Sequence, residues 1–131
     1  MVCLDTSVIV ALIRKDERAL EKLATNEVKG RVISTTVMNL CELYAGAYGS
    51  REPSRELEKV QGLISRLALL ELSVDASRKY GELINHRAIR EQPIGDFDLI
   101  IASIALSHGE PLATRNVDHF ARVPGLSVEL W

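Results

Sequence analysis

The sequence has little cysteine and no long hydrophobic run. Its two cysteines, Cys3 and Cys41, stand in apolar surroundings without a CxxC pair or a nearby pair of histidines. A disulfide framework or a zinc site is therefore not expected, and this cysteine usage is typical of the reducing cytoplasm. The sequence has no stretch of about 18 uninterrupted apolar residues and no basic leader before its first apolar run. We expect neither a membrane span nor a secretory signal.

An excess of charge of one sign is also absent. Sixteen Lys and Arg residues face eighteen Asp and Glu residues, a formal net charge of −2 with neutral histidines. Since no overall positive field attracts nucleic acid or an anionic membrane, any polyanion must be held by local cations. The length of 131 residues and the 47% hydrophobic content predict one folded domain over residues 1–131, which buries roughly two thirds of its unfolded surface.

Several common catalytic motifs are missing. The sequence contains no GxxxxGK[ST] loop, no GxGxxG after its first apolar run and no GxSxG, which argues against nucleotide-binding and serine-hydrolase sites. Asp5-Thr6-Ser7 lacks the second aspartate, two residues on, that an aspartyl-phosphate phosphatase uses as its acid. The histidines His86, His108 and His119 fall in polar or helix-terminal contexts, and we interpret them as surface residues.

Short apolar runs alternate with amphipathic segments along the chain. The pattern predicts strands at 2–4, 31–34, 69–74, 112–114 and 126–130, with helices between them that include a buried helix over 99–106. Strands separated by helices require right-handed crossovers. The predicted fold class is therefore α/β, a three-layer α/β/α sandwich with a mostly parallel central sheet. Ligands of such sheets bind beyond the carboxyl ends of the strands.

Polar residues follow two of the predicted strands. Asp5 ends the first strand, and its alternative role is to cap the next helix, a task that Thr6 or Ser7 could perform instead. Thr114 and Asn116 follow another strand, where the alternative is a polar turn that bonds its own backbone. Because the carboxyl ends of parallel strands share one edge, we expect these side chains to lie together.

Three further carboxylates lie on or before helices. Glu42 stands in mid-helix among small residues, and its alternative is a solvated surface position. Asp96 and Asp98 precede the most apolar helix, where one carboxylate suffices as a cap worth about 0.3–1 kcal/mol through the helix dipole. We expect all three to lean over the sheet edge that carries Asp5.

Carboxylates that share one pocket repel each other. At about 4 Å two such charges repel by roughly 4 kcal/mol at an effective dielectric of 20, so the group holds either protons or a cation. Ligands that are all oxygen atoms suit Mg²⁺ or Mn²⁺, which keep several waters and take phosphate oxygens as further ligands. The sequence therefore favours metal-dependent phosphoester chemistry.

Several stretches together resemble a PIN domain of the VapC toxin type. They are Leu4-Asp5-Thr6-Ser7-Val8, Glu42-Leu43, Phe97-Asp98-Leu99-Ile100-Ile101-Ala102, Thr114-Arg115-Asn116 and the ending from Phe120 to Trp131. The resemblance implies the PIN fold and a Mg²⁺- or Mn²⁺-dependent endoribonuclease, the toxin of a type II toxin–antitoxin pair. It also implies two partners, a VapB antitoxin that inhibits the toxin and binds operator DNA, and a second copy in a homodimer.

The resemblance also implies roles for individual residues. Asp5 and Asp98 match the family's main metal-ligating aspartates, Glu42 matches its glutamate, and Thr114 and Asn116 fall in its strand-end motif. Many PIN domains carry a further acid at the position of Asn116, or one immediately before the phenylalanine that matches Phe120.

This chain has His119 immediately before Phe120. Asp96 and Asp118 are alternative sources of the missing charge, and the number of metals stays open.

The resulting hypothesis places one Mg²⁺ on Asp5 and Asp98. Asp96 and Asn116 complete its outer shell, and Glu42 positions or deprotonates the attacking water. Thr6 and Thr114 support the site.

The candidate RNA contacts are Arg115, followed by Arg14 and Lys15, and their alternative role is solubility. An apolar groove for the antitoxin is expected, lined by Leu40, Tyr44 and Tyr48 or by the Leu57–Leu67 helix.

Two other functions fit the same residues. The first is a catalytically weak or inactive binding module whose acidic pocket receives an arginine of a partner protein. The second is a Mg²⁺-dependent phosphatase or DNA nuclease that uses the same ligands.

Overall fold

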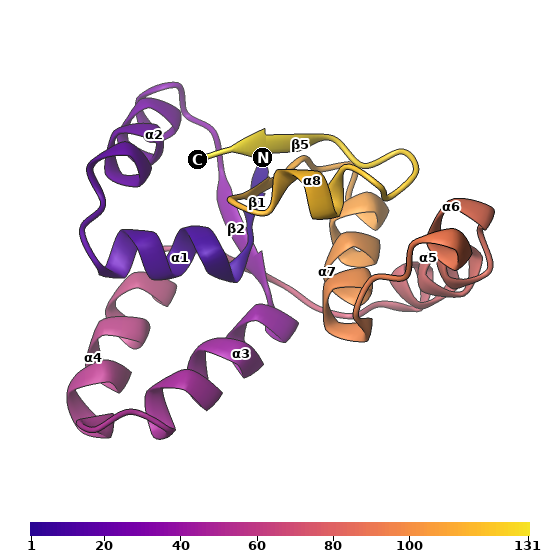
Figure 1. The fold of residues 1–131 in the computed structure, drawn as a ribbon. Helices are drawn as coiled ribbons and strands as arrows, with labels where there is room; N and C mark the ends of the chain where they lie inside the picture. Colours follow the sequence, from indigo (N-terminus) through magenta and orange to yellow (C-terminus); the bar gives the residue numbers. More distant parts are fainter.

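Five parallel strands form the central sheet of the computed structural model, which describes residues 1–131 (Figure 1). They are β1 (Val2–Leu4), β2 (Ile33–Thr36), β3 (Ala68–Leu70), β4 (Leu112–Thr114) and β5 (Val128–Leu130). Their order across the sheet is β3-β2-β1-β4-β5, and every neighbouring pair is parallel. The first strand of the chain therefore lies at the centre of the sheet.

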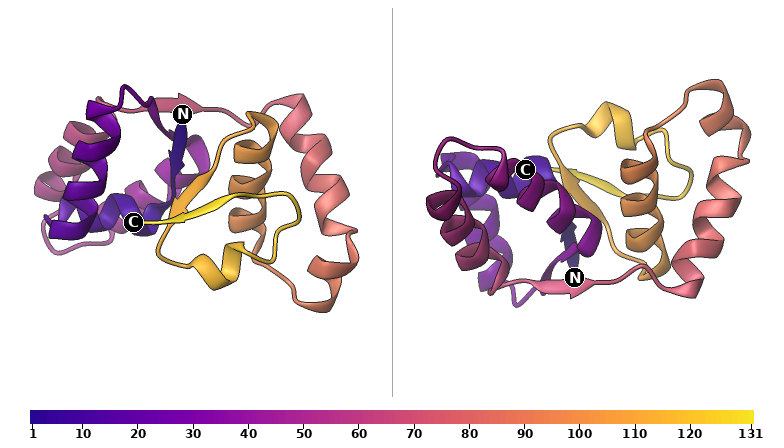
Figure 2. Two further views of the ribbon diagram at one scale, coloured as in Figure 1. Left: turned by 90° about the horizontal axis from the view of Figure 1, so that it is seen from above. Right: turned by 90° about the horizontal axis from the view of Figure 1, so that it is seen from below.

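Eight helices surround the sheet. They are α1 (Thr6–Ile13), α2 (Glu17–Val28), α3 (Val37–Tyr48), α4 (Pro53–Ile64), α5 (Val74–Ile84), α6 (Arg87–Glu91), α7 (Asp96–Ser107) and α8 (Val117–Phe120). Figure 2 shows α1 to α4 on one side of the strands and α5 to α7 on the other. This arrangement confirms the predicted α/β/α sandwich. None of these helices combines the length and the apolar character that crossing a membrane requires.

Two hydrophobic cores pack against the two sides of the sheet. One joins the apolar faces of α1 to α4 to β1 and β2, and Trp131 is buried within it. The other is built around α7, in which Leu99, Ile101 and Ile104 are fully buried. A helix that is apolar on nearly every side is expected to be buried, and α7 confirms that expectation.

The boundaries of several elements differ from the predicted ones. The third strand ends at Leu70 rather than at Val74, because β3 pairs only with the short β2. The hydroxyl of Ser73 then accepts the backbone N–H of Ala76 and caps α5. The strands β2 and β5 each begin two residues later than predicted, and the short helix α8 was not predicted.

The two cysteines differ in their accessibility. Cys3 lies fully buried in β1, where burial, reinforced by the charge of Glu110, raises the pKa of its thiol to about 12. Cys41 is exposed on α3. We expect a maleimide reagent to label one thiol per chain in the native protein and two in denaturant, as counted by mass spectrometry. Rapid labelling of both thiols in the native protein would contradict the buried position of Cys3.

An ion pair joins the final strand to the segment before β2. The guanidinium of Arg31 donates to both carboxylate oxygens of Glu129, at 3.0 and 2.6 Å. This contact lowers the pKa of Glu129. A lowered carboxylate pKa contributes stability above the unfolded-state value of about 4.3, and that stability is lost as the pH falls through the folded value.

Substitution of Glu129 should therefore destabilise the protein in a pH-dependent way. We expect Glu129→Gln to lower the free energy of unfolding by about 1 kcal/mol at neutral pH, because the pair is only partly exposed. The difference in the free energy of unfolding between the wild type and Glu129→Gln should become smaller below about pH 4, as measured by urea unfolding. The exposed Glu71, changed to Gln, provides the control. If the difference in unfolding free energy between Glu129→Gln and the wild type did not depend on pH, the charge of Glu129 would not be its source.

Candidate active site

The carboxyl ends of β1, β2 and β4 meet at one edge of the sheet. The backbone N–H of Asp5 donates to the carbonyl of Ala113 at 2.9 Å, which brings Asp5 beside Thr114 at the end of β4. The helix α3 begins directly after β2, with Thr36 as its N-cap. The polar residues predicted to gather after the strands therefore do share one edge.

Asp5 is held by three donors at this edge. Thr114 and Ser7 donate their hydroxyls to its Oδ2 at 2.8 and 3.0 Å, and Asn39 donates to its Oδ1 at 3.4 Å. The side chain is 4% exposed. Although the backbone of Asp5 occupies the N-cap position of α1, its carboxylate makes no capping hydrogen bond. The carboxylate is therefore oriented toward the strand ends rather than used to cap the helix.

Asn39 links Asp5 to Glu42. Its buried side-chain oxygen accepts the hydroxyl of Thr36 at 2.7 Å, which orients its amide to donate to Thr6 Oγ1 at 2.9 Å as well as to Asp5. Thr6 in turn donates to Glu42 Oε1 at 2.7 Å. A continuous chain of hydrogen bonds thus holds two carboxylates from different elements.

Asn39 and Ser7 were not predicted as site residues. The available signal for Asn39 was its spacing from Thr36, which forms a capping box at the start of α3. No comparable signal marked Ser7, which lies within hydrogen-bonding distance of both Asp5 and Thr114 and also accepts the backbone N–H of Arg115.

Glu42 is electrostatically coupled to two other carboxylates. Burial raises the pKa of Glu42, and the negative charges of Asp5 and Asp98 raise it further, while the hydrogen bond from Thr6 opposes the rise. Because coulombic effects fall with distance, this coupling brings Asp5, Glu42 and Asp98 into one electrostatic group.

Asp98 lies in the first turn of α7 and contacts α8. The Nε2 atom of His119 is 2.9 Å from Asp98 Oδ2, and the two side chains are 31% and 34% exposed. His119 is therefore not the free surface residue that the sequence suggested. Both residues line a cavity of about 550 Å³ whose other residues are Arg115, Asn116, Val117, Asp118 and Leu130.

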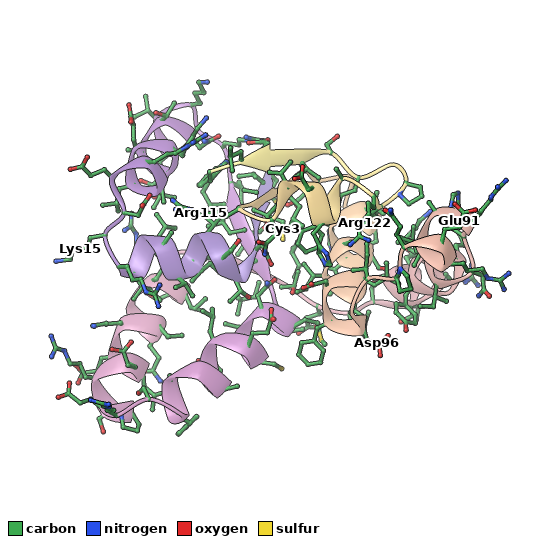
Figure 3. All side chains as sticks on the ribbon, viewed as in Figure 1. Cys3, Lys15, Glu91, Asp96, Arg115 and Arg122 are labelled. Atoms are coloured by element: carbon green, nitrogen blue, oxygen red, sulfur yellow. The ribbon has the colours of Figure 1, made fainter.

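The structure does not bring Asp96 into this group. Its carboxylate accepts the hydroxyl of Tyr80 from α5 at 3.2 Å, and Figure 3 shows it at the lower end of α7. Asn116, in contrast, lies beside the site, since it lines the same cavity as Asp98 and its backbone N–H donates to Thr114 Oγ1 at 3.0 Å. Asp118 lines the same cavity.

The predicted RNA contacts are dispersed. Arg115 lines the Asp98 cavity and forms an ion pair with Asp16, which lowers the pKa of that carboxyl group. Arg14 lines a second cavity, of about 520 Å³, together with Glu42. Lys15 lies outside both cavities, and Figure 3 shows its side chain pointing away from the molecule.

The second cavity lies between α1, α3 and α4 and differs from the predicted groove. Its apolar lining residues are Val10, Ile13, Leu43, Ala47 and Val60. Leu40 and Tyr44 pack instead against the core, and Tyr48 is 68% exposed outside the cavity. Of the two predicted linings, only the Leu57–Leu67 helix contributes, through Val60 and Lys59. The α3 residues that line this cavity are on the Leu43 side of the helix, whereas Leu40 and Tyr44 stay partly buried beside it.

The carboxylates of the site are oxygen ligands suited to a hard cation. No group of three His, Cys, Asp or Glu side chains is close enough to hold a metal ion by itself. Mg²⁺ usually binds through one or two carboxylates and keeps several waters, so it needs no such cage. The oriented Asp5 and the partly exposed Asp98 fit this mode of binding.

Comparison with known proteins gives matches over nearly the whole chain. The family model of the PIN domain matches residues 2–126. The tRNA(fMet)-specific endonuclease VapC of Salmonella typhimurium is 35% identical over 129 residues, which cover 98% of this chain and 96% of that protein. The ribonuclease VapC2 of Rickettsia felis is 30% identical over 128 residues, with the same shares of the two chains.

Two solved structures are similar along their full length. VapBC2 from Rickettsia felis, bound to a DNA fragment from its promoter, contains a chain with a TM-score of 0.92 and 29% identity, and the match covers 100% of this chain and 99% of that one. DNA-bound VapBC from Salmonella typhimurium gives a TM-score of 0.90 and 34% identity with the same coverage.

Proposed function

This chain belongs to the PIN domain family, with VapC ribonucleases among its relatives, and we propose that it is a metal-dependent endoribonuclease, the toxin of a type II toxin–antitoxin pair. The family membership confirms the resemblance found in the sequence. The observation that supports the activity most strongly is the chain of hydrogen bonds through Asn39 and Thr6 that holds the carboxylates of Asp5 and Glu42 at the carboxyl edge of the sheet.

In this proposal Asp5 and Asp98 hold one Mg²⁺ or Mn²⁺, directly or through water. When bound, such an ion lowers the pKa of a coordinated water and stabilises negative charge on the phosphate. Thr114 and Ser7 keep the carboxylate of Asp5 oriented by their hydrogen bonds. Asp96 is not carried into this assignment because its carboxylate bonds to Tyr80.

Glu42 is assigned the role of general base. Its raised pKa makes it a better proton acceptor than an ordinary glutamate, and Thr6 fixes one of its oxygens. It would take a proton from the attacking water. In-line displacement at the phosphate then leaves a 5′-phosphate and a 3′-hydroxyl on the two RNA products.

The RNA strand needs cations on both sides of this acidic centre. Arg14 lies in the cavity that contains Glu42, and Arg115 lies in the cavity that contains Asp98. We assign these two residues to the phosphates that flank the cleaved bond. Asn116 lines the cavity beside Arg115 and is assigned to the outer shell of the metal.

The similar structures are complexes named VapBC, both bound to DNA. We infer that this chain likewise binds a VapB-like antitoxin and acts in the cytoplasm, as a single domain that forms a homodimer. The cavity between α1, α3 and α4 offers that partner an apolar surface beside Glu42.

The activity can be tested with purified protein and three substrates: a mixed RNA pool, single-stranded DNA and a small phosphate monoester. We expect cleavage of RNA that requires Mg²⁺ or Mn²⁺, stops on addition of EDTA and yields 5′-phosphorylated fragments. Preferential hydrolysis of DNA or of the monoester would indicate the other phosphoesterase functions. Absence of hydrolysis with either metal would favour a binding module.

A further inference from the structure

His119 is placed between a site carboxylate and an arginine. Its Nε2 atom faces Asp98 Oδ2 at 2.9 Å, and its Nδ1 atom faces the guanidinium Nη2 of Arg122, also at 2.9 Å. Both nitrogens of the ring are therefore in use, one toward α7 and the other toward the segment after α8.

The partners of the ring determine where its proton lies. A guanidinium has only donors, so Nδ1 of His119 must accept the hydrogen bond from Arg122. The proton of the neutral ring then resides on Nε2, from which it is donated to the carboxylate of Asp98. Arg122 and Asp98 thus favour the same neutral tautomer, with the proton on Nε2.

The ring and the guanidinium are both fixed in orientation. The buried ring of Phe120 meets His119 edge to face, with centroids 5.2 Å apart and planes at 87°. The Nε and Nη1 atoms of Arg122 donate to the backbone carbonyls of His119 and Gln92 at 3.3 and 3.2 Å. Each of the three guanidinium nitrogens therefore has a partner that limits its rotation.

We propose that His119, held by Arg122, is a positioning residue that orients the Asp98 carboxylate for the metal. The proposal rests on the proposed function for the identity of the ion. Because His119 contacts the Oδ2 atom of Asp98 at 2.9 Å, the other carboxylate oxygen would be the one available to hold the ion. Hydrogen bonds that orient a ligating carboxylate typically contribute 10- to 100-fold to metal affinity or activity.

The tautomer can be measured without metal or RNA. The nitrogen chemical shifts of His119 at about pH 8, where an ordinary histidine is neutral, should show a protonated Nε2 and an unprotonated Nδ1. In Arg122→Met the Nδ1 resonance should shift, because Nδ1 loses its hydrogen-bond donor, while Nε2 should stay protonated because the Asp98 carboxylate still accepts from it. A protonated Nδ1 in the wild-type protein would overturn the proposal, as would an Nδ1 resonance that is unchanged in Arg122→Met.

Metal affinity gives the second test, by titration with Mn²⁺ alone. We expect His119→Ala to weaken binding by about 10- to 100-fold. His119→Gln places an amide donor near the position of Nε2 and should stay within about threefold of the wild type. The control is His108→Ala, which changes the exposed histidine at the other end of α7.

Mn²⁺ binding by His119→Ala that is as tight as that of the wild type, or tighter, would overturn the positioning role. A loss of Mn²⁺ affinity in His119→Gln as large as that in His119→Ala would also overturn it, because a purely steric role is lost in both variants. The outcomes separate the two proposals. A wild-type protein that binds Mn²⁺ but cuts no RNA would overturn the proposed function only, and the variant affinities would still support or overturn the role of His119.

Discussion

Replacing Asp98 by asparagine is expected to reduce metal-dependent RNA cleavage by more than about 100-fold. The substitution removes one of only two carboxylates assigned to the ion, and an effect larger than that of an outer-shell residue should follow. The side chain is 34% exposed at the start of α7, so the fold should tolerate the change. Initial rates at increasing Mg²⁺ concentrations measure the effect.

The control for this variant is Asp118→Asn. Asp118 lines the same cavity as Asp98 but does not contribute to the raised pKa of Glu42. Its substitution should change the rate by less than about tenfold, as expected for a residue outside the ligand set. Near wild-type cleavage by Asp98→Asn at saturating Mg²⁺ would remove Asp98 from the metal site.

Replacing Glu42 by glutamine is expected to slow cleavage by about 100- to 10,000-fold while leaving Mn²⁺ affinity nearly unchanged. A general base contributes a factor of this size, and an amide cannot accept the proton. The neighbouring Glu56 lines the same cavity, and Glu56→Gln is the matched control. If Glu42→Gln lost metal binding as fully as Asp98→Asn, Glu42 would be a ligand rather than a base.

The same variant should not destabilise the metal-free protein. Burial and the charges of Asp5 and Asp98 raise the pKa of Glu42 in the folded state. The folded protein thus binds this proton more readily than the unfolded chain, so the ionised group lowers stability as the pH rises above its unfolded value. In EDTA at neutral pH, the free energy of unfolding of Glu42→Gln should equal or exceed that of the wild type.

The sequence predicted the edge of the sheet that carries the site. Asp5 follows β1 and Thr114 ends the adjacent parallel strand β4, and strand alternation alone places such residues side by side. The buried character of α7 was equally predictable, because its sequence is apolar in all directions.

The sequence pattern alone did not separate Asp96 from Asp98, although the family resemblance assigned the metal-ligating role to Asp98. A helix turns by about 100° per residue, so residues that are two positions apart, such as Asp96 and Asp98, lie about 200° apart around its axis. The two carboxylates therefore face nearly opposite directions. Only the packing of α5 against α7 decides which one meets Tyr80 and which one faces the strand ends.

The environment of His119 was likewise not predictable from the sequence, because it depends on how the elements pack in the folded structure. The short helix α8 was not predicted, because four residues carry too little periodicity to be recognised. The histidine reaches Asp98 only through that helix, and the arginine three residues later completes the contact. A polar sequence context is therefore a poor guide to whether a side chain is solvated.

The location of the ion is the most direct test of the account, and anomalous diffraction from crystals grown with Mn²⁺ measures it. We predict one strong anomalous peak between the carboxylates of Asp5 and Asp98, which disappears in crystals of Asp98→Asn. A peak bound elsewhere on the protein, or none at this edge of the sheet under conditions that support RNA cleavage, would contradict the account.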